Sequence, residues 1–464
     1  MPTDLESPAP PPRPWSWKKI LPGFLGILTV FLIVILAYDQ KLEPYDDLKP
    51  TRTSVPDATT NGFLFLKEKW AGLPEPSSQE QKQAQDMVQG TAPWDAGILT
   101  KMRPGREHAA ADLKAALAMP EWLVPPTLTY KQLMAEPFHP WIIRSCRYLS
   151  LEASAAVRAG DFPAALALLQ DLQQLSRRHI EGSGNLISYL VGVSLQTQAA
   201  ALCCDLLDQG QPDAAQVEAM AKLWQTEPDA ISGWDASMRS EMAVASEFIG
   251  GIKSGTAPEE PAPWFSRLLL KSGLLLKKNQ TLNHYHRRMR NLMQVAYQKF
   301  PSMEAAGRAG LRNLPERSFL GKMVDPNFVG SQLVAGTESY VSIAKSLRKV
   351  FFEPRAIRVR LALHRWRATH PDQWPATLEE LVPDFLAAVP EDPWNGNPLL
   401  WDASAQIIYA VGSDWKPDLP AFSATRRSWF ADDAESPGLR LTLPPPPPIP
   451  VAPVRKSTTV PAPK

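Results

Sequence analysis

Residues 20–38 constrain this chain more than any other stretch, because they read ILPGFLGILTVFLIVILAY without one charged side chain. Only Thr29 and Tyr38 carry hydroxyl groups. A helix rises about 1.5 Å per residue, so a run of this length matches the roughly 30 Å hydrocarbon layer of a bilayer. A core helix of similar length would normally show a polar stripe, and this run has none. We predict a transmembrane helix over 20–38, with the lipid bilayer as its partner.

The charges that flank this run differ in sign. Three basic residues precede it, and four acidic residues with two lysines follow it: Arg13, Lys18 and Lys19, then Asp39, Glu43, Asp46 and Asp47 with Lys41 and Lys49. The positive-inside rule therefore predicts a single-pass protein with a cytoplasmic N-terminus. The alternative is a cleaved signal peptide. Cleavage after Ala37 requires a small residue at position 35, which is Ile35, so an uncleaved anchor is preferred.

Composition describes a globular protein with proline-rich ends. Of 464 residues, 44% are apolar and 21% are charged, and the net charge of +1 gives no basic field that would indicate nucleic-acid binding. Prolines number 47, about twice the usual frequency of roughly 5%. They crowd into PAPPPRP at 8–14 and PPPPPIP at 444–450. Such runs favour extended polyproline II and build no core.

Between the anchor and the last hundred residues, the pattern is helical. Asp161 can cap a helix that begins at Phe162, with Pro163 in its tolerated first turn. Further helices are predicted over 139–159, 186–207, 213–224, 230–252 and 280–300. The short connections predict antiparallel packing in a mainly α fold.

The text RAGDFPAALALLQDL, residues 158–172, resembles the turn and second helix of a tetratricopeptide repeat. No second copy is found at the period of about 34 residues, and such solenoids need about three repeats. A helical hairpin within a bundle is therefore the preferred interpretation. A helical-repeat module that binds peptides remains the alternative.

The region after 355 has a different character. A helix is predicted to end near Thr369, and Thr377 with Glu380 forms a capping box. Asn395-Gly396 suits a tight turn, and two strands are predicted over Leu399–Trp401 and Gln406–Val411. A hairpin alone is marginal in water, so we expect the 355–369 helix to back it, with Trp366 and Trp374 in the core.

HPDQWPATLEELVPDFLAAVPEDPWNGNP (370–398) and IIYAVGSD (407–414) resemble the C-terminal part of the major pseudopilin of type II secretion. The matching positions are Trp374-Pro375, Leu378–Pro383, Asp392-Pro393-Trp394, Asn397-Pro398 and Tyr409–Asp414. The resemblance covers about 60 residues. It implies a small α+β module, and a calcium site in the loop that holds Asp414 and, nearby, Asp418.

The chain departs from that family in three ways. Some 300 residues separate its apolar run from the module, whereas pseudopilins join the two almost directly. Gly23-Phe24 matches the start of the processing site, but Leu28 stands where the family has Glu. Trp415 replaces a glycine of the calcium loop. As a whole, the chain is similar to large bacterial membrane-anchored proteins that carry such a module after a helical domain. That resemblance implies the bacterial inner membrane, with the bulk of the chain periplasmic or extracytoplasmic.

Two histidine pairs are candidate metal ligands, and neither has a spacing that suits a metal site on a helix. On a helix, the rings of His284 and His286 point about 200° apart, so a solvated basic face is predicted instead. His364 and His370 are six residues apart, which is the wrong spacing for one helix face. His370 is predicted to suit the dipole at a helix end.

Other polar clusters indicate no reaction. Five arginines are predicted to form the solvated outer face of the 355–369 helix, or to meet anionic lipid or an acidic partner: Arg355, Arg358, Arg360, Arg365 and Arg367. No nucleophile elbow, phosphate loop, GxGxxG turn or HExxH occurs. The adjacent pairs Glu379-Glu380 and Asp432-Asp433 do not converge on a helix. Three cysteines without metal spacing are predicted to be buried thiols: Cys146, Cys203 and Cys204.

The predicted organisation has six parts: a cytoplasmic proline-rich tail (1–19), the transmembrane helix (20–38), a membrane-proximal helical region and linker (39–135), a helical domain (136–330), a pseudopilin-like α+β module (338–430) and a disordered proline-rich tail (431–464). The expected role is structural or scaffolding, with envelope proteins as partners and a link to secretion or pilus-type machinery. No catalytic residue, metal or cofactor is predicted, although an enzyme with an unrecognised site remains a further alternative.

Overall fold

The computed structural model describes residues 38–51, 54, 56–89, 91–135, 139–254, 276–297, 327, 330–331, 333, 338–412, 416–422, 428–431 and 437–443. The predicted transmembrane helix lies outside these residues except for Tyr38. The chain forms two compact units. One comprises Met1–Pro44, Ser246–Tyr285 and Glu316–Thr337, and the other comprises Tyr45–Ala245, His286–Pro315 and Glu338–Lys464.

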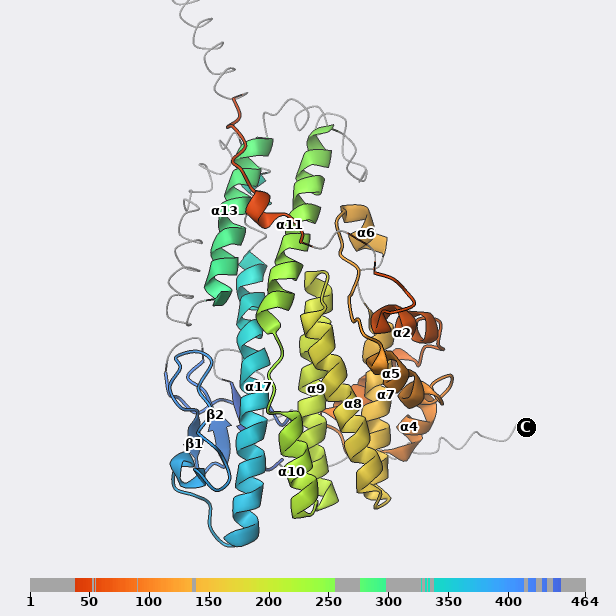
Figure 1. Cartoon of the computed structure of the whole chain (residues 1–464), viewed down its shortest axis with the longest axis vertical. Helices are drawn as coiled ribbons and strands as arrows, with labels where there is room; N and C mark the ends of the chain where they lie inside the picture. Colours follow the sequence, from red (N-terminus) through yellow and green to blue (C-terminus); the bar gives the residue numbers. More distant parts are fainter. Residues whose placement is uncertain are drawn as a thin grey trace, which may run out of the picture. The chain divides into compact units, whose positions relative to one another are not determined.

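The larger unit begins with a short 3-10 helix, η1 (Asp46–Leu48), and five helices: α2 (Gly62–Trp70), α3 (Ser78–Val88), α4 (Ala96–Met102), α5 (Ala109–Ala118) and α6 (Tyr130–Ala135) (Figure 1). Polar side chains cap the starts of α2, α3 and α4, and Ser77 with Glu80 forms a capping box for α3. Helices α2 to α5 pack against α7. The part of the predicted membrane-proximal region that they occupy therefore belongs to the helical unit.

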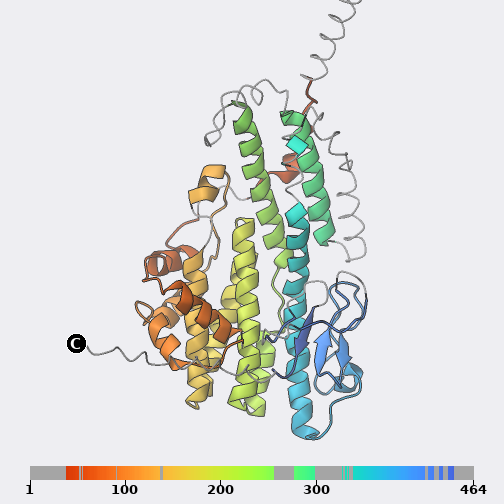
Figure 2. The ribbon, with the colours of Figure 1, turned by 180° about the vertical axis from the view of Figure 1, so that it is seen from behind.

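A helical bundle forms the centre of this unit. It contains α7 (Pro140–Arg158), α8 (Phe162–Glu181), α9 (Leu186–Gly210), α10 (Ala214–Leu223) and α17 (Glu338–Thr369). Helix α9 contacts α3, α7, α8 and α17, and Figures 1 and 2 show it between α8 and α17. The helices predicted from caps and periodicity are confirmed, including the one that Asp161 caps by accepting from the Ala164 amide.

Helix α9 is apolar enough to resemble a membrane span. Of the helices within the described ranges, it alone has the length and composition for crossing a bilayer, but 78% of its apolar stretch is buried inside the protein. Neighbouring helices cover it on several sides, which explains why its sequence lacks a polar face. It is the core helix of the bundle.

The C-terminal region packs on α17 as a small α+β module. A 3-10 helix, η2 (Leu378–Leu381), precedes three antiparallel strands in the order β1 (Leu400–Asp402), β2 (Ile407–Tyr409) and β3 (Gly438–Arg440). The predicted hairpin is confirmed, with Trp401 opposite Ile408, and Gly396 has the positive φ of 76° that its turn requires. The mainly α fold with a small α+β module is therefore as predicted.

Strand β3 corrects the predicted tail. Disorder was expected from 431 onward, but Leu439 pairs with Ile408 of β2, and both Leu439 and Leu441 are buried. The proline run begins only at 444. Between the described positions 437 and 443, the residues alternate apolar and polar side chains, which is the pattern of a half-buried strand.

The tryptophans of the module's core also differ from the prediction. Trp366 and Trp374 are only half-buried, whereas Trp394 and Trp429 are each 1% exposed. The Trp394 ring meets Phe352 of α17 edge-on, with 6.2 Å between ring centroids. The periodicity of apolar residues along α17 could not identify Trp394 and Trp429 as core residues, because both come from segments far from α17 in the sequence.

The described part of the smaller unit includes the end of α11 (Ala230–Ser254) and the start of α13 (Lys278–Tyr297). Asp39 closes the N-terminus of α13, because its two carboxylate oxygens accept the amides of Asn279 at 2.8 Å and Gln280 at 3.0 Å. The first amides of a helix have no partner within the helix, so a carboxylate placed there satisfies them and suits the helix dipole.

Candidate functional site

His284 and His286, the HxH pair, lie on α13 as predicted. Within the described ranges, no group of three or more His, Cys, Asp or Glu side chains is placed to hold a metal ion. The prediction of a solvated face is wrong for His286 and Arg288, which are buried. The His286 ring lies 4.4 Å from the Tyr45 ring, so a segment far away in the sequence covers it.

The second histidine pair is also separated. His370 is exposed at the end of α17 and stacks on Trp366 at 4.0 Å, which matches its predicted place at a helix end. His364 is half-buried, and burial followed by the charge of Arg360 lowers its pKa. The two histidines therefore occupy different environments and form no joint site.

The arginine-rich face of α17 differs most from its prediction. It was expected to be solvated, but Arg355 and Arg358 both bind the Glu227 carboxylate, at 2.8 and 3.0 Å. Arg360 is 4% exposed and binds Asp208 of α9 at 2.7 Å. These arginines are thus intramolecular contacts between α17 and its neighbours, and the charge pattern alone could not distinguish such contacts from a surface.

The remaining predicted residues have structural roles or lie outside the described residues. Burial raises the pKa of all three cysteine thiols, which fits the prediction of buried, unreactive side chains. Glu380 completes the predicted capping box with Thr377. Asp414, Trp415, Asp432 and Asp433 fall outside the described residues, and Asp418 is exposed. The calcium site stays a prediction.

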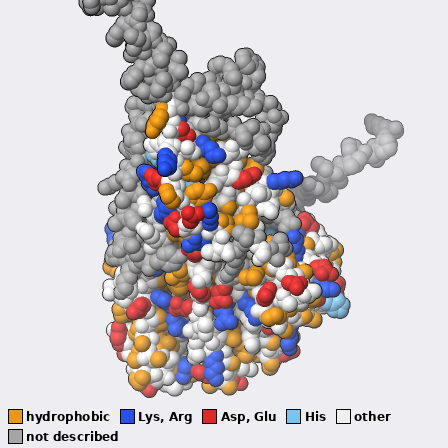
Figure 3. All heavy atoms as spheres, turned by 45° about the horizontal axis from the view of Figure 1, so that its top comes forward, with side chains coloured by type: hydrophobic (Ala, Val, Ile, Leu, Met, Phe, Trp, Pro, Cys, Tyr) orange, Lys and Arg blue, Asp and Glu red, His pale blue; other side chains and the backbone are white. Residues whose placement is uncertain are grey.

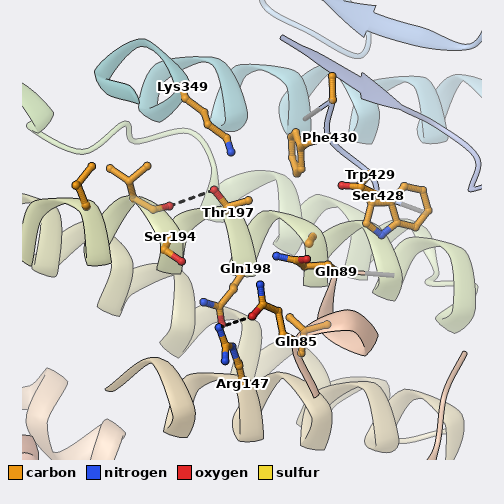
Figure 4. Close-up of a pocket in the computed structure, with 15 residues that line it drawn as sticks. Gln85, Gln89, Arg147, Ser194, Thr197, Gln198, Lys349, Ser428, Trp429 and Phe430 are labelled. Atoms are coloured by element: carbon orange, nitrogen blue, oxygen red, sulfur yellow. Dashed lines mark hydrogen bonds between the residues drawn. The ribbon is translucent and has the colours of Figure 1, made fainter. Parts of the chain in front are cut away.

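A cleft in the larger unit is the strongest candidate for a functional site. It has a volume of about 400 Å³ and is bounded by α3, α7, α9, α17 and the segment 428–431 (Figure 4). Amides, hydroxyls and two cations make up its polar lining: Gln85, Gln89, Arg147, Ser194, Thr197, Gln198, Lys349 and Ser428. No carboxylate belongs to the lining formed by the described residues.

One end of the cleft holds Arg147. Its guanidinium donates to Gln85 Oε1 at 3.0 Å and forms no ion pair with any described residue. Burial, and then the positive charge of Arg144, lower the pKa of Arg147, whereas Asp86 partly opposes this effect. Gln198 lies in the same end, where its side chain extends toward Arg147 and Gln85 in Figure 4. This end of the cleft is electropositive.

The other end holds Lys349, whose charge is balanced. Its ammonium lies 3.5 Å from the carboxylate of Glu353, one turn along α17. Glu353 is completely buried, and it also accepts from the Thr197 hydroxyl at 2.8 Å. Burial raises the pKa of Glu353, while Lys349 and the hydrogen bonds oppose that shift. The pair is one cation and one carboxylate, so this end has no excess charge when both are ionised.

An apolar wall lines one side of the cleft (Figure 4). Trp429 and Phe430 are 1% and 6% exposed, and they are placed by β3. The Arg440 amide donates to the Trp429 carbonyl at 3.0 Å, and Phe430 forms a bridge with Leu439. The Arg360 guanidinium lies over the Trp429 ring at 4.1 Å. The wall is therefore preformed.

No pattern in the sequence predicts this cleft. Its residues come from α3, α7, α9, α17 and the segment before β3, and none belongs to a recognised motif. One signal was present: Ser194, Thr197 and Gln198 lie close together on a mostly apolar helix, and a buried polar group such as the Gln198 amide needs a partner.

The outer surface of the protein is a weaker candidate for a functional site than the cleft. On the face shown in Figure 3, acidic and basic side chains intermingle among the described residues, as a net charge of +1 leads one to expect.

Comparison with known proteins adds no further indication of function: no family model, no curated protein and no solved structure matches the chain. The pseudopilin resemblance accordingly stays a prediction.

Proposed function

We propose that the chain is a single-pass protein of the bacterial inner membrane whose extracytoplasmic part serves as a scaffold for envelope proteins. One observation carries this proposal: residues 20–38 contain no charge and follow a basic segment, whereas acidic residues come after them. A span of this kind keeps the units that follow it at the membrane surface.

The many contacts between elements of the larger unit support a scaffolding role. Arginines of α17 join it to α9 and to the loop before α11, and β3 is joined to α17 by Arg360, which donates to the Arg440 carbonyl at 2.8 Å. A rigid body built from many contacts can present a fixed surface to a partner.

The module favours secretion or pilus-type machinery as the context. Asp392, in the DPW turn that carries the pseudopilin resemblance, accepts the amides of Trp394 and Val411, each at 2.8 Å. One buried carboxylate thus joins the turn to the end of strand β2. This arrangement gives a physical reason for an aspartate before Pro-Trp at this place in the module.

Membrane extraction tests the anchor. A Leu32→Arg variant places a charge near the middle of the span, where insertion costs about 2.5–3.5 kcal/mol. We expect the wild-type chain to stay with membranes after an alkaline wash and the variant to be released. Leu5→Arg, which lies before the span, serves as the matched control. Release of the wild-type chain would contradict the proposal, as would digestion of its C-terminal half by protease added from the cytosolic side.

Crosslinking in intact cells tests the scaffold. We expect envelope proteins to be captured by the wild-type chain and lost when the anchor variant is used. Recovery of only the monomer, from cells in which the chain is fully membrane-bound, would contradict a scaffolding role while leaving the anchor in place.

A further inference from the structure

We infer that the cleft between α3, α7, α9 and α17 binds an N-acylated amino acid with an apolar side chain, either as a free molecule or as the C-terminal residue of a peptide. Such a ligand has a carboxylate, a neighbouring amide N–H and an apolar group. The inference goes beyond the proposed function, because the cleft would bind this ligand whether or not the chain is anchored in a membrane.

The charge of the cleft selects an anion. Its lining includes no carboxylate among the described residues, and the charge of Lys349 is balanced by Glu353. Arg147 donates to one neutral acceptor, the Gln85 amide oxygen, and the nearby Asp86 carboxylate only partly offsets its charge environment. A half-buried guanidinium is best satisfied by a carboxylate, because the opposite charges attract and the two carboxylate oxygens can accept two parallel N–H bonds. Arg147 therefore places the ligand's carboxylate.

A second observation concerns Gln198, which is 9% exposed and lies on α9 facing the cleft. Its Oε1 atom is buried and has no hydrogen-bond donor among the described residues. Buried polar atoms normally have a partner, so this oxygen calls for an N–H or O–H group. In an N-acylated amino acid, the amide N–H is one carbon away from the carboxylate, which matches an acceptor beside Arg147.

The volume of the cleft and its apolar wall determine the size and the apolar character of the rest of the ligand. A volume of about 400 Å³ lies in the range of small-molecule sites, roughly 300–1,000 Å³. Leu190, Val193 and Phe430 supply apolar contacts. An apolar side chain on the ligand would displace water from this wall, whereas a second charge would be left without a partner.

Calorimetric titration of the full chain in detergent tests this inference, with N-acetyl-phenylalanine as the probe. We expect saturable binding of N-acetyl-phenylalanine and at least ten-fold weaker binding of N-acetyl-phenylalaninamide, which lacks the carboxylate. Phenylacetate, which lacks the N–H, and inorganic phosphate should also bind more weakly. The peptide Ala-Ala-Phe and its C-terminal amide separate the two sources: tighter binding of the free-acid peptide than of the acetylated residue indicates a peptide ligand.

Variants assign the site. We expect Arg147→Met to weaken binding about ten-fold or more, as loss of a charged hydrogen bond does. Arg147→Lys should retain part of the affinity, and Gln198→Met should weaken binding of the N-acetylated probe but not of phenylacetate. Arg365→Met, at an ion pair outside the cleft, is the matched control. Circular dichroism confirms that each variant is folded. No binding of any probe to the wild-type chain, or unchanged binding to a folded Arg147→Met variant, would overturn the inference.

Discussion

Pro354 lies inside α17, where a proline leaves the carbonyl four residues earlier without its helical donor. That carbonyl belongs to Val350, and it accepts the side-chain amide of Gln196 from α9 at 2.9 Å. The same amide lies 3.3 Å from the Glu353 carboxylate. One buried glutamine therefore compensates for the proline and helps to solvate the buried carboxylate beside it.

Replacement of Gln196 tests this compensation. We expect Gln196→Leu to lower the free energy of unfolding by about 1–3 kcal/mol, because it leaves a buried carbonyl and a carboxylate short of a donor. Urea denaturation of the wild-type and variant chains measures the loss. In a Pro354→Ala background, the helix can satisfy Val350 itself, so the same substitution should cause a smaller loss. An equal loss in both backgrounds would contradict the role of Val350.

A pH dependence follows from His179, which is buried near the rings of Phe63 and Trp122, 5.7 and 6.2 Å away. Burial, and then the neighbouring His139, lower the pKa of His179 to about 3. Its ordinary pKa is about 6.5, so the unfolded chain takes up a proton before the folded chain does. The contribution of neutral His179 to stability is full above about pH 6.5 and decreases as the pH falls toward 3.

Urea denaturation at a series of pH values measures this effect. We expect His179→Phe to remove part of the stability loss between pH 6.5 and 4, where each pH unit is worth up to about 1.4 kcal/mol for one such group. His370→Phe is the matched control, because it makes the same substitution at an exposed histidine. A steeper slope in His179→Phe than in the wild-type chain would be incompatible with a buried neutral imidazole.

At the scale of elements, Arg360 joins three of them. From α17, its guanidinium binds Asp208 of α9, donates to the Arg440 carbonyl of β3 and lies over the Trp429 ring. An almost fully buried guanidinium needs several acceptors, and these contacts provide them. The third strand is thus held to the bundle by one side chain in addition to its pairing with β2.

Hydrogen exchange tests this junction. We expect Arg360→Met to lower stability by about 2 kcal/mol, because it removes hydrogen bonds of a charged group and leaves the partly exposed Asp208 unpaired. Exchange should rise most at 437–443. Arg365→Met, whose ion pair with Glu218 is much more exposed, should change stability by less than about 1 kcal/mol. Equal effects of the two variants, or unchanged exchange at 437–443, would contradict the role of Arg360.

Elements with local signals were predictable, and their contacts were not. The caps at Asp161 and Asp213 identify the starts of α8 and α10, because a capping side chain bonds amides two or three residues away. The surroundings of Arg360, in contrast, depend on Asp208 and Arg440, which are 152 and 80 positions away, so its charge suggested solvent. β3 was missed for a related reason: three residues form a strand only because β2 provides the partner.

At the scale of the whole chain, the cleft is the feature furthest from any local pattern. Gln85 and Phe430 line the same space although 345 positions separate them in the sequence. Neither residue lies in a sequence motif that is typical of a ligand-binding site. The sequence shows that three polar residues, Ser194, Thr197 and Gln198, lie close together on the mostly apolar α9. It does not show which other elements face them. The proposed anchor shows the opposite relation, since the evidence for it lies in one short stretch and the charges that flank it.

The segment after the proposed anchor is tied to the folded chain through Asp39, whose carboxylate accepts two amides at the start of α13. We expect a chain that begins at Tyr38 to move to the aqueous fraction with unchanged stability, because the contacts of Asp39 are retained. Asp39→Ala in the full chain should instead raise hydrogen exchange at 279–283, at a cost of about 0.5–2 kcal/mol, as for other helix caps. Asp46→Ala, which removes an exposed pair with Lys49, is the control that should leave this exchange unchanged. If the truncated chain stayed with the membrane, some part after 37 would hold it there, and the anchor over 20–38 would not explain its location.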